Sequence, residues 1–200
     1  MVDDKDSNNY DGNYGQQSMG IKLHGGYGFD MGNDTVVFGD SLSGDDIVMG
    51  GDGTDVLTYT DVTSVDGSEL DNVYDIERVV VSGTDINLTL TNTLFSETVG
   101  AGVGSDATID ASGGTGLTLN ATNESVSDLL IIGTGGVDSV TLGGGSDAVS
   151  LGGGADYVDA SSISADSINL GDGNDTVVFN AALTSADTVD GGAGAADMLV

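Results

Sequence analysis

Residues 143–179 read GGGSDAVSLGGGADYVDASSISADSINLGDGNDTVVF, and this stretch decides the fold. It alternates Gly- or Ser-rich segments with short apolar triplets such as Val149-Ser-Leu151 and Val177-Val-Phe179. An apolar residue at every second position predicts a short strand with one buried face. Glycine recurs too often to leave a helix with an apolar stripe of useful length. The stretch therefore predicts very short strands that are joined by turns.

The repeated unit is an Asp followed two residues later by an aliphatic residue. It recurs at Asp128, Asp138, Asp147, Asp156, Asp166, Asp175, Asp187 and Asp197, and an N-terminal copy runs through Asp34, Asp46 and Asp55. A unit of about nine residues is too short to fold alone. We expect two units to form one coil of roughly 18 residues, and stacked coils to bury a continuous ladder of aliphatic side chains.

Such stacking predicts an all-β fold, a right-handed parallel β-roll or β-helix solenoid with short strands and Gly-Asp calcium loops. Four segments are expected: an irregular N-terminal segment over 1–24, a Gly-Asp repeat block over 25–60, metal-poor parallel β-helix coils over 61–132, and a β-roll over 133–200. The middle segment lacks the full turn motif. Its predicted apolar rungs are Val79–Val81, Ile86–Leu90, Leu117–Leu119 and Leu130–Ile132.

The charge balance is strongly acidic. The 200 residues include 33 acidic and three basic ones, for a formal net charge of −30, and no Lys or Arg follows Arg78. Such a chain repels itself when compact, and divalent cations would offset the repulsion. The same charge argues against nucleic acid and against anionic membranes. No apolar run is long enough to insert in a membrane. Because Cys is absent, stability must come from packing or metal.

The turns before the repeated Asp residues carry the chemistry. Most turns place one Gly two positions before the Asp and another Gly four positions before it. Glycine permits positive φ, so a turn can aim carbonyl oxygens inward, and the Asp adds a carboxylate. One turn supplies only some of the six to eight oxygens that Ca²⁺ requires, so the ion is expected between turns of adjacent coils. The predicted metal ligands and their glycines are Asp34, Asp46, Gly51, Asp52, Gly53, Asp55, Gly136, Asp138, Gly143, Gly145, Asp147, Gly152, Gly154, Asp156, Gly171, Asp172, Gly173 and Asp175.

Spacing divides these turns between two edges of the solenoid. Asp138, Asp156 and Asp175 are 18 and 19 residues apart and should share an edge that holds two ions. On the opposite edge Asp147 is expected to pair with Asp128 and Asp166, whose turns lack glycine and predict empty or weak sites. An alternative is that all of these are ordinary Asp-Gly turns in a metal-free β-helix, because both residues favour turns for local reasons.

The turn pattern resembles the RTX family, the haemolysin-type calcium-binding repeats, whose nonapeptide is Gly-Gly-x-Gly-x-Asp-x-aliphatic-x. The resemblance is close over 50–58 and 143–179. It implies type I secretion and folding on calcium binding outside the cell. The Thr- and Asn-rich strands of the middle segment, exemplified by Ile86–Asn92, resemble those of surface-layer and adhesin-like β-repeat proteins. We therefore expect a surface-layer or adhesin type of protein, extracellular or on the cell surface, with other surface-protein subunits or cell-surface glycans as candidate partners.

Two alternatives stay open. The first is the C-terminal RTX domain of a secreted enzyme, such as a protease, a lipase or a polysaccharide-modifying enzyme, with catalysis outside these residues. The chain itself is predicted not to be an enzyme, because His24 is its single histidine and no zincin motif or nucleophile elbow is present. The second is a solenoid that recognises sugar or ice, for which Thr89, Thr118 and Thr141 do not recur at one constant rung position.

Overall fold

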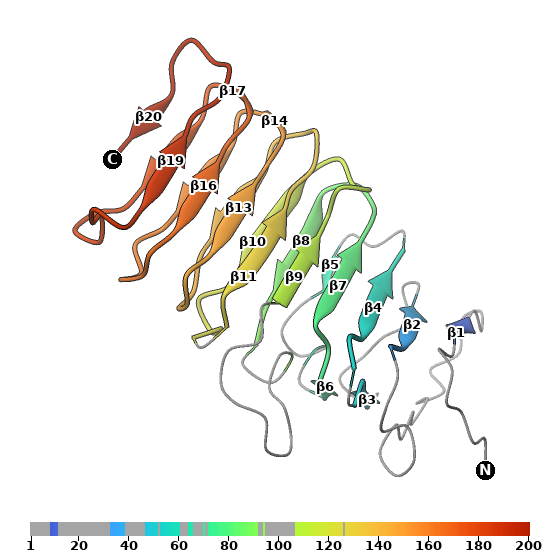
Figure 1. The fold of residues 1–200 in the computed structure, drawn as a ribbon. Helices are drawn as coiled ribbons and strands as arrows, with labels where there is room; N and C mark the ends of the chain where they lie inside the picture. Colours follow the sequence, from blue (N-terminus) through green and yellow to red (C-terminus); the bar gives the residue numbers. More distant parts are fainter. Residues whose placement is uncertain are drawn as a thin grey trace.

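The fold is all-β and consists of short parallel strands stacked in coils. The computed structural model describes residues 9–11, 33–38, 47–51, 53–60, 64–65, 70, 72–91, 94, 107–125 and 127–200. Figure 1 shows the strands as successive rungs between the two chain ends. In the described part of the chain, no helix is long and apolar enough to cross a membrane.

Two parallel sheets form the walls of the solenoid. Among the described residues, sheet 1 contains β1 (Asn9–Asp11), β2 (Thr35–Phe38), β4 (Val56–Tyr59), β7 (Arg78–Val81), β9 (Ala107–Asp110), β11 (Leu129–Ile132), β13 (Ala148–Ser150), β16 (Ser167–Asn169) and β19 (Thr188–Asp190). Sheet 2 contains β5 (Ser64–Val65), β8 (Ile86–Thr89), β10 (Leu117–Asn120), β12 (Ser139–Thr141), β15 (Tyr157–Asp159), β18 (Thr176–Val178) and β20 (Met198–Leu199). Two small ladders pair β3 (Val48–Met49) with β6 (Val73–Tyr74), and β14 (Gly153–Gly154) with β17 (Asp172–Gly173).

From β7 onward the chain alternates between sheet 1 and sheet 2, so two strands make one coil (Figure 1). Val140 pairs with Val158, and Val158 pairs with Val177, one coil further on. These steps are the coil of about 18 residues that the repeat spacing predicts. The prediction of a parallel β-solenoid is thus confirmed.

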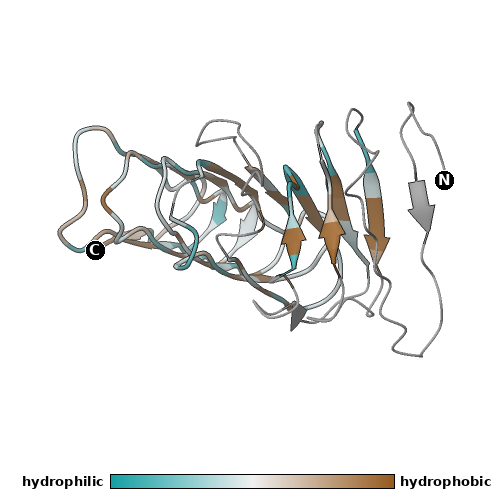
Figure 2. Cartoon of the chain, turned by 90° about the horizontal axis from the view of Figure 1, so that it is seen from below, coloured by the Kyte–Doolittle hydropathy of each residue, from teal (hydrophilic) through white to brown (hydrophobic). Residues whose placement is uncertain are grey.

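The core lies between the two sheets. Every second strand residue points inward, so Leu57, Val79 and Ile109 from sheet 1 face Leu88 and Leu119 from sheet 2 in one continuous buried cluster. In Figure 2 the apolar colouring covers much of several strands, and hydrophilic colouring appears at strand ends and on parts of the connecting segments. Burial of this aliphatic ladder is the main favourable contribution to folding.

One predicted rung has the wrong phase. Leu130 was expected to point inward, but it is 41% exposed, while Leu129 and Ile131 are buried. Four consecutive apolar residues, Leu129 to Ile132, erase the alternation that would reveal the phase. The register with β13, which pairs Ile131 with Val149, sets the inward positions instead.

Several corners begin with the same side-chain hydrogen bonds. Asn120 ends β10, and its Oδ1 accepts hydrogen bonds from the backbone N–H of Thr122 at 3.1 Å and from its hydroxyl at 2.7 Å. Asp110 with Ser112, and Asp159 with Ser161, repeat this arrangement. In each case a buried Ala separates the two residues. The Ala N–H still bonds to the next coil, and the side chain accepts the second N–H after the strand, where the ladder has ended.

Candidate metal sites at the two edges

The turns form two edges, which we name by the direction in which the chain crosses. Edge I includes the turns from sheet 1 to sheet 2, residues 82–85, 111–116, 133–138, 151–156, 170–175 and 191–197. Edge II includes the turns from sheet 2 to sheet 1, residues 121–128 (described except for residue 126), 142–147, 160–166 and 179–187. Each edge carries a column of Asp residues that immediately precede a strand.

On edge I the column contains Asp138, Asp156, Asp175 and Asp197. The N–H of Asp138 donates to Oδ1 of Asp156 at 2.8 Å, and the N–H of Asp156 donates to Oδ1 of Asp175 at 2.8 Å. The N–H of Asp175 donates to Oδ1 of Asp197 at 3.2 Å. Asp138, Asp156 and Asp175 therefore stack on one edge, as their spacing predicts. Asp197 extends the column by one coil.

Asp138 differs from the Asp residues above it in the stack. Its Oδ1 accepts the N–H of Leu117 and the hydroxyl of Thr134, at 2.8 and 2.7 Å. Its Oδ2 accepts the N–H of Thr134 at 2.8 Å. Thr134 occupies the position that Gly152 and Gly171 hold in the next two turns. Hydrogen bonds within its own turn thus satisfy both oxygens of Asp138, and the sequence pattern did not foresee this.

Asp156 and Asp175 each have a buried oxygen, Oδ2, that has no hydrogen-bond partner. Both side chains are almost fully buried. Burial raises the pKa of Asp156 to about 6, against the hydrogen bond from Asp138, and the negative charges of Asp138 and Asp175 raise it further. A buried anion with an unsatisfied oxygen is unfavourable unless a proton or a cation compensates it.

Glycine is required in these turns because carbonyl oxygens of one coil approach the next closely. A Cβ on Gly173 would lie 1.7 Å from the carbonyl oxygen of Gly154, and a Cβ on Gly171 would lie 2.0 Å from that of Gly152. Gly171 also has a φ of +94°. Carbonyl oxygens thus line the space between turns 151–156 and 170–175. Asp172, exposed between these two glycines, pairs with Gly153 through its backbone.

Edge II has its own column of Asp residues. The N–H of Asp147 donates to Oδ1 of Asp166 at 3.1 Å, and the N–H of Asp166 donates to Oδ1 of Asp187 at 2.9 Å. Oδ2 of both Asp147 and Asp166 is buried without a hydrogen-bond partner. Burial is the main cause that raises the pKa of Asp147 to about 7, and it also raises that of Asp166. Gly143 and Gly145 lie in the turn before Asp147.

The predicted pairing of Asp147 with Asp128 is wrong by one residue. The N–H that donates to Oδ1 of Asp147, at 3.0 Å, belongs to Leu129. Asp128 is exposed, and its Oδ1 instead accepts the N–H of Ser146 at 2.6 Å. The cause is the same phase error that placed Leu130 inward. The pairing of Asp147 with Asp166 is confirmed.

The N-terminal block shows the same arrangement before β2, β4 and β7. The N–H of Asp34 donates to Oδ1 of Asp55 at 2.7 Å, and the N–H of Asp55 donates to Oε2 of Glu77 at 2.6 Å. Burial raises the pKa of Asp55 to about 6, and its Oδ2 has no hydrogen-bond partner. Glu77 is not among the residues that the Asp-x-aliphatic repeat predicts, because the repeat requires Asp. Glu77-Arg-Val79 nevertheless has the same spacing.

Not every predicted ligand of the N-terminal block can be placed. Gly51, with a φ of +98°, and Gly53 belong to the turn that leads to Asp55. Asp46 and Asp52 lie outside the described residues.

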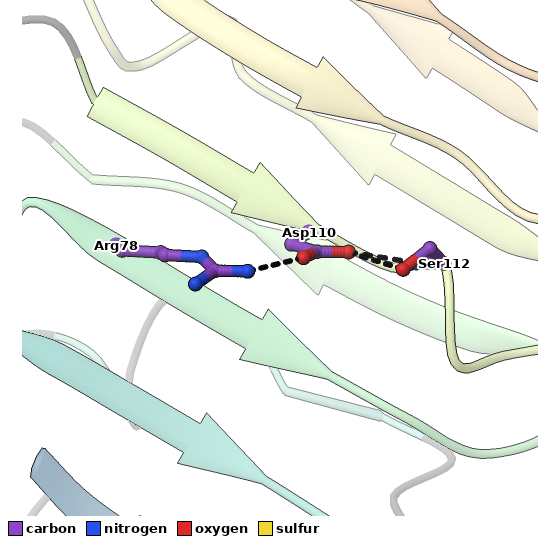
Figure 3. Close-up of polar contacts among 3 residues, drawn as sticks. All are labelled: Arg78, Asp110 and Ser112. Carbon is purple, nitrogen blue, oxygen red and sulfur yellow. Dashed lines mark hydrogen bonds and ion pairs between the residues drawn. The ribbon is translucent and has the colours of Figure 1, made fainter.

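Few basic side chains are available to neutralise these columns, because the sequence contains only three. In the described part of the chain, the ion pair found joins Arg78 to Asp110 on neighbouring strands β7 and β9 (Figure 3). Burial raises the pKa of Asp110, but hydrogen bonds from Ser112 and the charge of Arg78 outweigh it and hold the value below the usual range. No Lys or Arg follows Arg78, so the segment that holds the Asp residues of 133–197 contains no basic side chain of its own.

The donor chemistry of both edges fits a hard divalent cation. The available ligands are carboxylate and carbonyl oxygens, which Ca²⁺ prefers. No group of three or more His, Cys, Asp or Glu side chains that could hold a metal occurs among the described residues. An ion at these edges would therefore take much of its coordination from backbone carbonyls and water, with one or two carboxylates. Gly152, Gly154, Gly171 and Gly173 with Asp156 and Asp175 provide this combination on edge I.

Recognition of ice or sugar would use the outward faces of the sheets. Thr89 and Thr141 share one row of sheet 2, but Asn120 lies between them in register. Thr118 lies in the other row, between Asn87 and Ser139. The rows are polar, but no unbroken threonine row forms.

Comparison with protein-family models, with curated proteins and with solved structures finds no match to this chain.

Proposed function

We propose that the chain is a calcium-binding structural module, in which Ca²⁺ held between stacked Gly-Asp turns stabilises the solenoid. One observation carries this proposal. The Asp columns bury carboxylate oxygens that have no hydrogen-bond partner, in a segment without a single basic residue. A cation would supply the missing partner and remove the electrostatic repulsion between neighbouring carboxylates at the same time.

On edge I the ion would lie between turns 151–156 and 170–175. Asp156 and Asp175 would contribute Oδ2, since Oδ1 of each is already engaged by a backbone N–H. The carbonyl oxygens of Gly152 and Gly154, which face the next turn, would contribute further ligands. The pair of turns 133–138 and 151–156 is a poorer site, because Thr134 already satisfies both oxygens of Asp138.

The proposed setting follows from this chemistry and from the resemblance to RTX repeats. At low calcium the acidic coils repel one another, which lowers the stability of the fold and shifts the equilibrium toward the unfolded chain. In an extracellular medium, sites with dissociation constants of about 10⁻⁴–10⁻³ M fill, and binding drives folding. This behaviour suits a protein that is exported unfolded and assembles on the cell surface as part of a surface layer or an adhesin. The RTX tail of a secreted enzyme would behave in the same way.

The experiment is circular dichroism with thermal melting on metal-stripped protein, titrated with Ca²⁺ and, in parallel, with Mg²⁺. We expect Ca²⁺ to increase the β-sheet signal and the melting temperature in a saturable manner. Mg²⁺ should act more weakly, because it demands smaller, more regular octahedral coordination. A chelator that left both the spectrum and the melting temperature unchanged would contradict the proposal.

A matched pair of variants separates the columns from general charge effects. Asp175→Asn removes a buried carboxylate and keeps the acceptor for the N–H of Asp156. Asp159→Asn removes a charge from the outward face of β15 and keeps the acceptor for Ser161. Asp175→Asn should weaken the calcium response, and Asp159→Asn should preserve it.

A further inference from the structure

The glycine-free turn of residues 121–128 on edge II contains a deeply buried acid, Glu124. Glu124 is 1% exposed, and Asp147, in the next coil of the same edge, is also 1% exposed. Glu124 lies outside the Asp-x-aliphatic repeat. Two carboxylates from adjacent coils are thus buried where the spacing of glycines predicts an empty or weak site.

The hydrogen bonds do not compensate the charge of Asp147. Oε1 of Glu124 accepts the N–H of Ser127 at 2.9 Å, and Oδ1 of Asp147 accepts the N–H of Leu129 at 3.0 Å. Oδ2 of Asp147 is buried and has no hydrogen-bond partner. Burial is the first cause that raises the pKa of Asp147, and the charges of Asp166, Glu124 and Asp128 also raise it. The side chain of Glu124 is therefore close enough to Asp147 to interact electrostatically.

Backbone oxygens of the lower turn converge on the glycines of the upper turn. A Cβ on Gly143 would lie 2.1 Å from the carbonyl oxygen of Glu124 and 2.3 Å from that of Ala121. A Cβ on Gly145 would lie 2.0 Å from the carbonyl oxygen of Ser127. The space between these turns is therefore lined by oxygen atoms, and each carbonyl has two lone pairs.

We propose that Glu124 and Asp147 form a separate divalent-cation site on edge II, completed by backbone carbonyls of turn 121–128. The ligand class is a hard dication of calcium size, since every available donor is oxygen and two of them are carboxylates. The site forms where a glycine-free coil of the middle segment meets the first glycine-rich turn of edge II. It rests on the proposed function only for the identity of the ion, because its carboxylates belong to a different edge from Asp156 and Asp175.

The test is isothermal titration calorimetry of Ca²⁺ into metal-stripped full-length protein. Glu124→Gln and Asp147→Asn are each expected to lower the stoichiometry by one ion, or to weaken one site at least tenfold. Asp128→Asn is the matched control, because this exposed residue of the same turn keeps its acceptor for the N–H of Ser146. It should retain every ion. Asp147→Glu keeps the charge and should retain the edge II ion with altered affinity.

The outcomes separate this site from the proposed function. If Asp156→Asn and Asp175→Asn lose no ion while Glu124→Gln loses one, the edge I proposal fails and the edge II site stands. If wild-type protein binds calcium and both Glu124→Gln and Asp147→Asn bind the full number of ions with wild-type affinity, the edge II site is refuted. If either variant fails to give the wild-type circular dichroism spectrum in saturating calcium, the ion count of the other decides. Should both fail to fold, Asp147→Glu decides, and an unchanged affinity of every site would refute the proposal.

Discussion

Replacement of Asp156 by Asn should change the stability of the protein in opposite directions with and without calcium. Asn keeps an oxygen for the N–H of Asp138, which donates at 2.8 Å, and removes the buried negative charge. Without metal this charge destabilises the folded state, and in the proposed site the charged carboxylate would bind the cation. The two conditions therefore predict shifts of opposite sign.

The size of the stability change without metal follows from the pKa of Asp156, which burial raises from 3.8 to about 6. A shift of roughly two units corresponds to about 3 kcal/mol of destabilisation of the ionised, folded form, as an upper bound. The amide N–H₂ of Asn would occupy the place of the unpartnered oxygen, and an unmet donor costs about 1–3 kcal/mol. We expect a net gain of about 1 kcal/mol at pH 8, which raises the melting temperature by ~2–4 °C in a chain of this size.

In the presence of calcium, Asp156→Asn should be less stable than the wild type. An ion bound at ten to a hundred times its dissociation constant adds about 1.4–2.7 kcal/mol to wild-type stability. Asp156→Asn would lose most of this gain, because a neutral amide oxygen replaces a carboxylate. The assay is thermal melting followed by circular dichroism at pH 8, on metal-stripped protein and in about 10 mM Ca²⁺, which exceeds the typical extracellular dissociation constants. A variant that melted below wild type in both conditions, or above it in both, would refute the reasoning.

Four further predictions follow from the same geometry. The metal-stripped protein should lose stability as the pH rises from about 4 to about 7. The reason is that Asp55, Asp147 and Asp156 have raised pKa values of about 6, 7 and 6, so they bind more protons in the folded than in the unfolded state. Urea unfolding across this pH range measures the loss, and a calcium-saturated sample should show a flatter dependence of stability on pH. Gly173→Ala should destabilise the protein by about 1–3 kcal/mol or more and lower its melting temperature accordingly, because the new Cβ would meet a carbonyl oxygen at 1.7 Å. The control Gly135→Ala, which has nothing within 4 Å of the new Cβ, should be neutral or slightly stabilising. Equal effects of the two variants on the melting temperature would contradict the stacked-turn geometry. Thr134→Val should cost about 1–3 kcal/mol, because it removes the hydroxyl that donates to Asp138 and accepts from Gly136, with the outward Thr141→Val as the control in chemical denaturation. Leu119→Ala should cost about 2–5 kcal/mol, while Leu130→Ala, at a position that is 41% exposed, should cost far less; similar costs would mean that the inward face of the coil is assigned wrongly.

The fold was predictable because three features of the sequence agree. The aliphatic pairs around Val149, Val158 and Ile168, the glycines between them and the regular Asp spacing all specify the same coil. The prediction failed at Leu129–Ile132, where every residue is apolar and the alternation carries no phase information. There the register is decided by which N–H reaches the carboxylate of Asp147, a contact between coils that no local pattern encodes.

The candidate sites were predictable only in part. Glycine spacing found the turns, but it could not show that Thr134 satisfies Asp138 from within its own turn. Nor could it show that Glu124, outside the repeat, is buried close to Asp147. Both facts depend on how one turn lies over another in three dimensions. A sequence motif describes one turn at a time, so it does not reveal side chains that the neighbouring coil contributes.

The Asp residues of both columns have a structural role that does not require metal. Oδ1 of Asp156 or Asp166 receives a backbone N–H just before a strand begins, where the N–H of the preceding coil needs an acceptor. The same residue would thus be favoured in a metal-free solenoid, and the repeated Asp alone does not distinguish the two cases. The second carboxylate oxygen, Oδ2, distinguishes a metal-free from a metal-binding solenoid. A solenoid without cations would be more stable with Asn, which keeps the acceptor for the N–H and lacks the charge. The chain instead has Asp at 138, 147, 156, 166, 175, 187 and 197. Five of them, at 138, 147, 156, 166 and 175, are buried. Repeated burial of charge along both columns is an arrangement that physical stability alone would disfavour, unless an ion is bound between the coils.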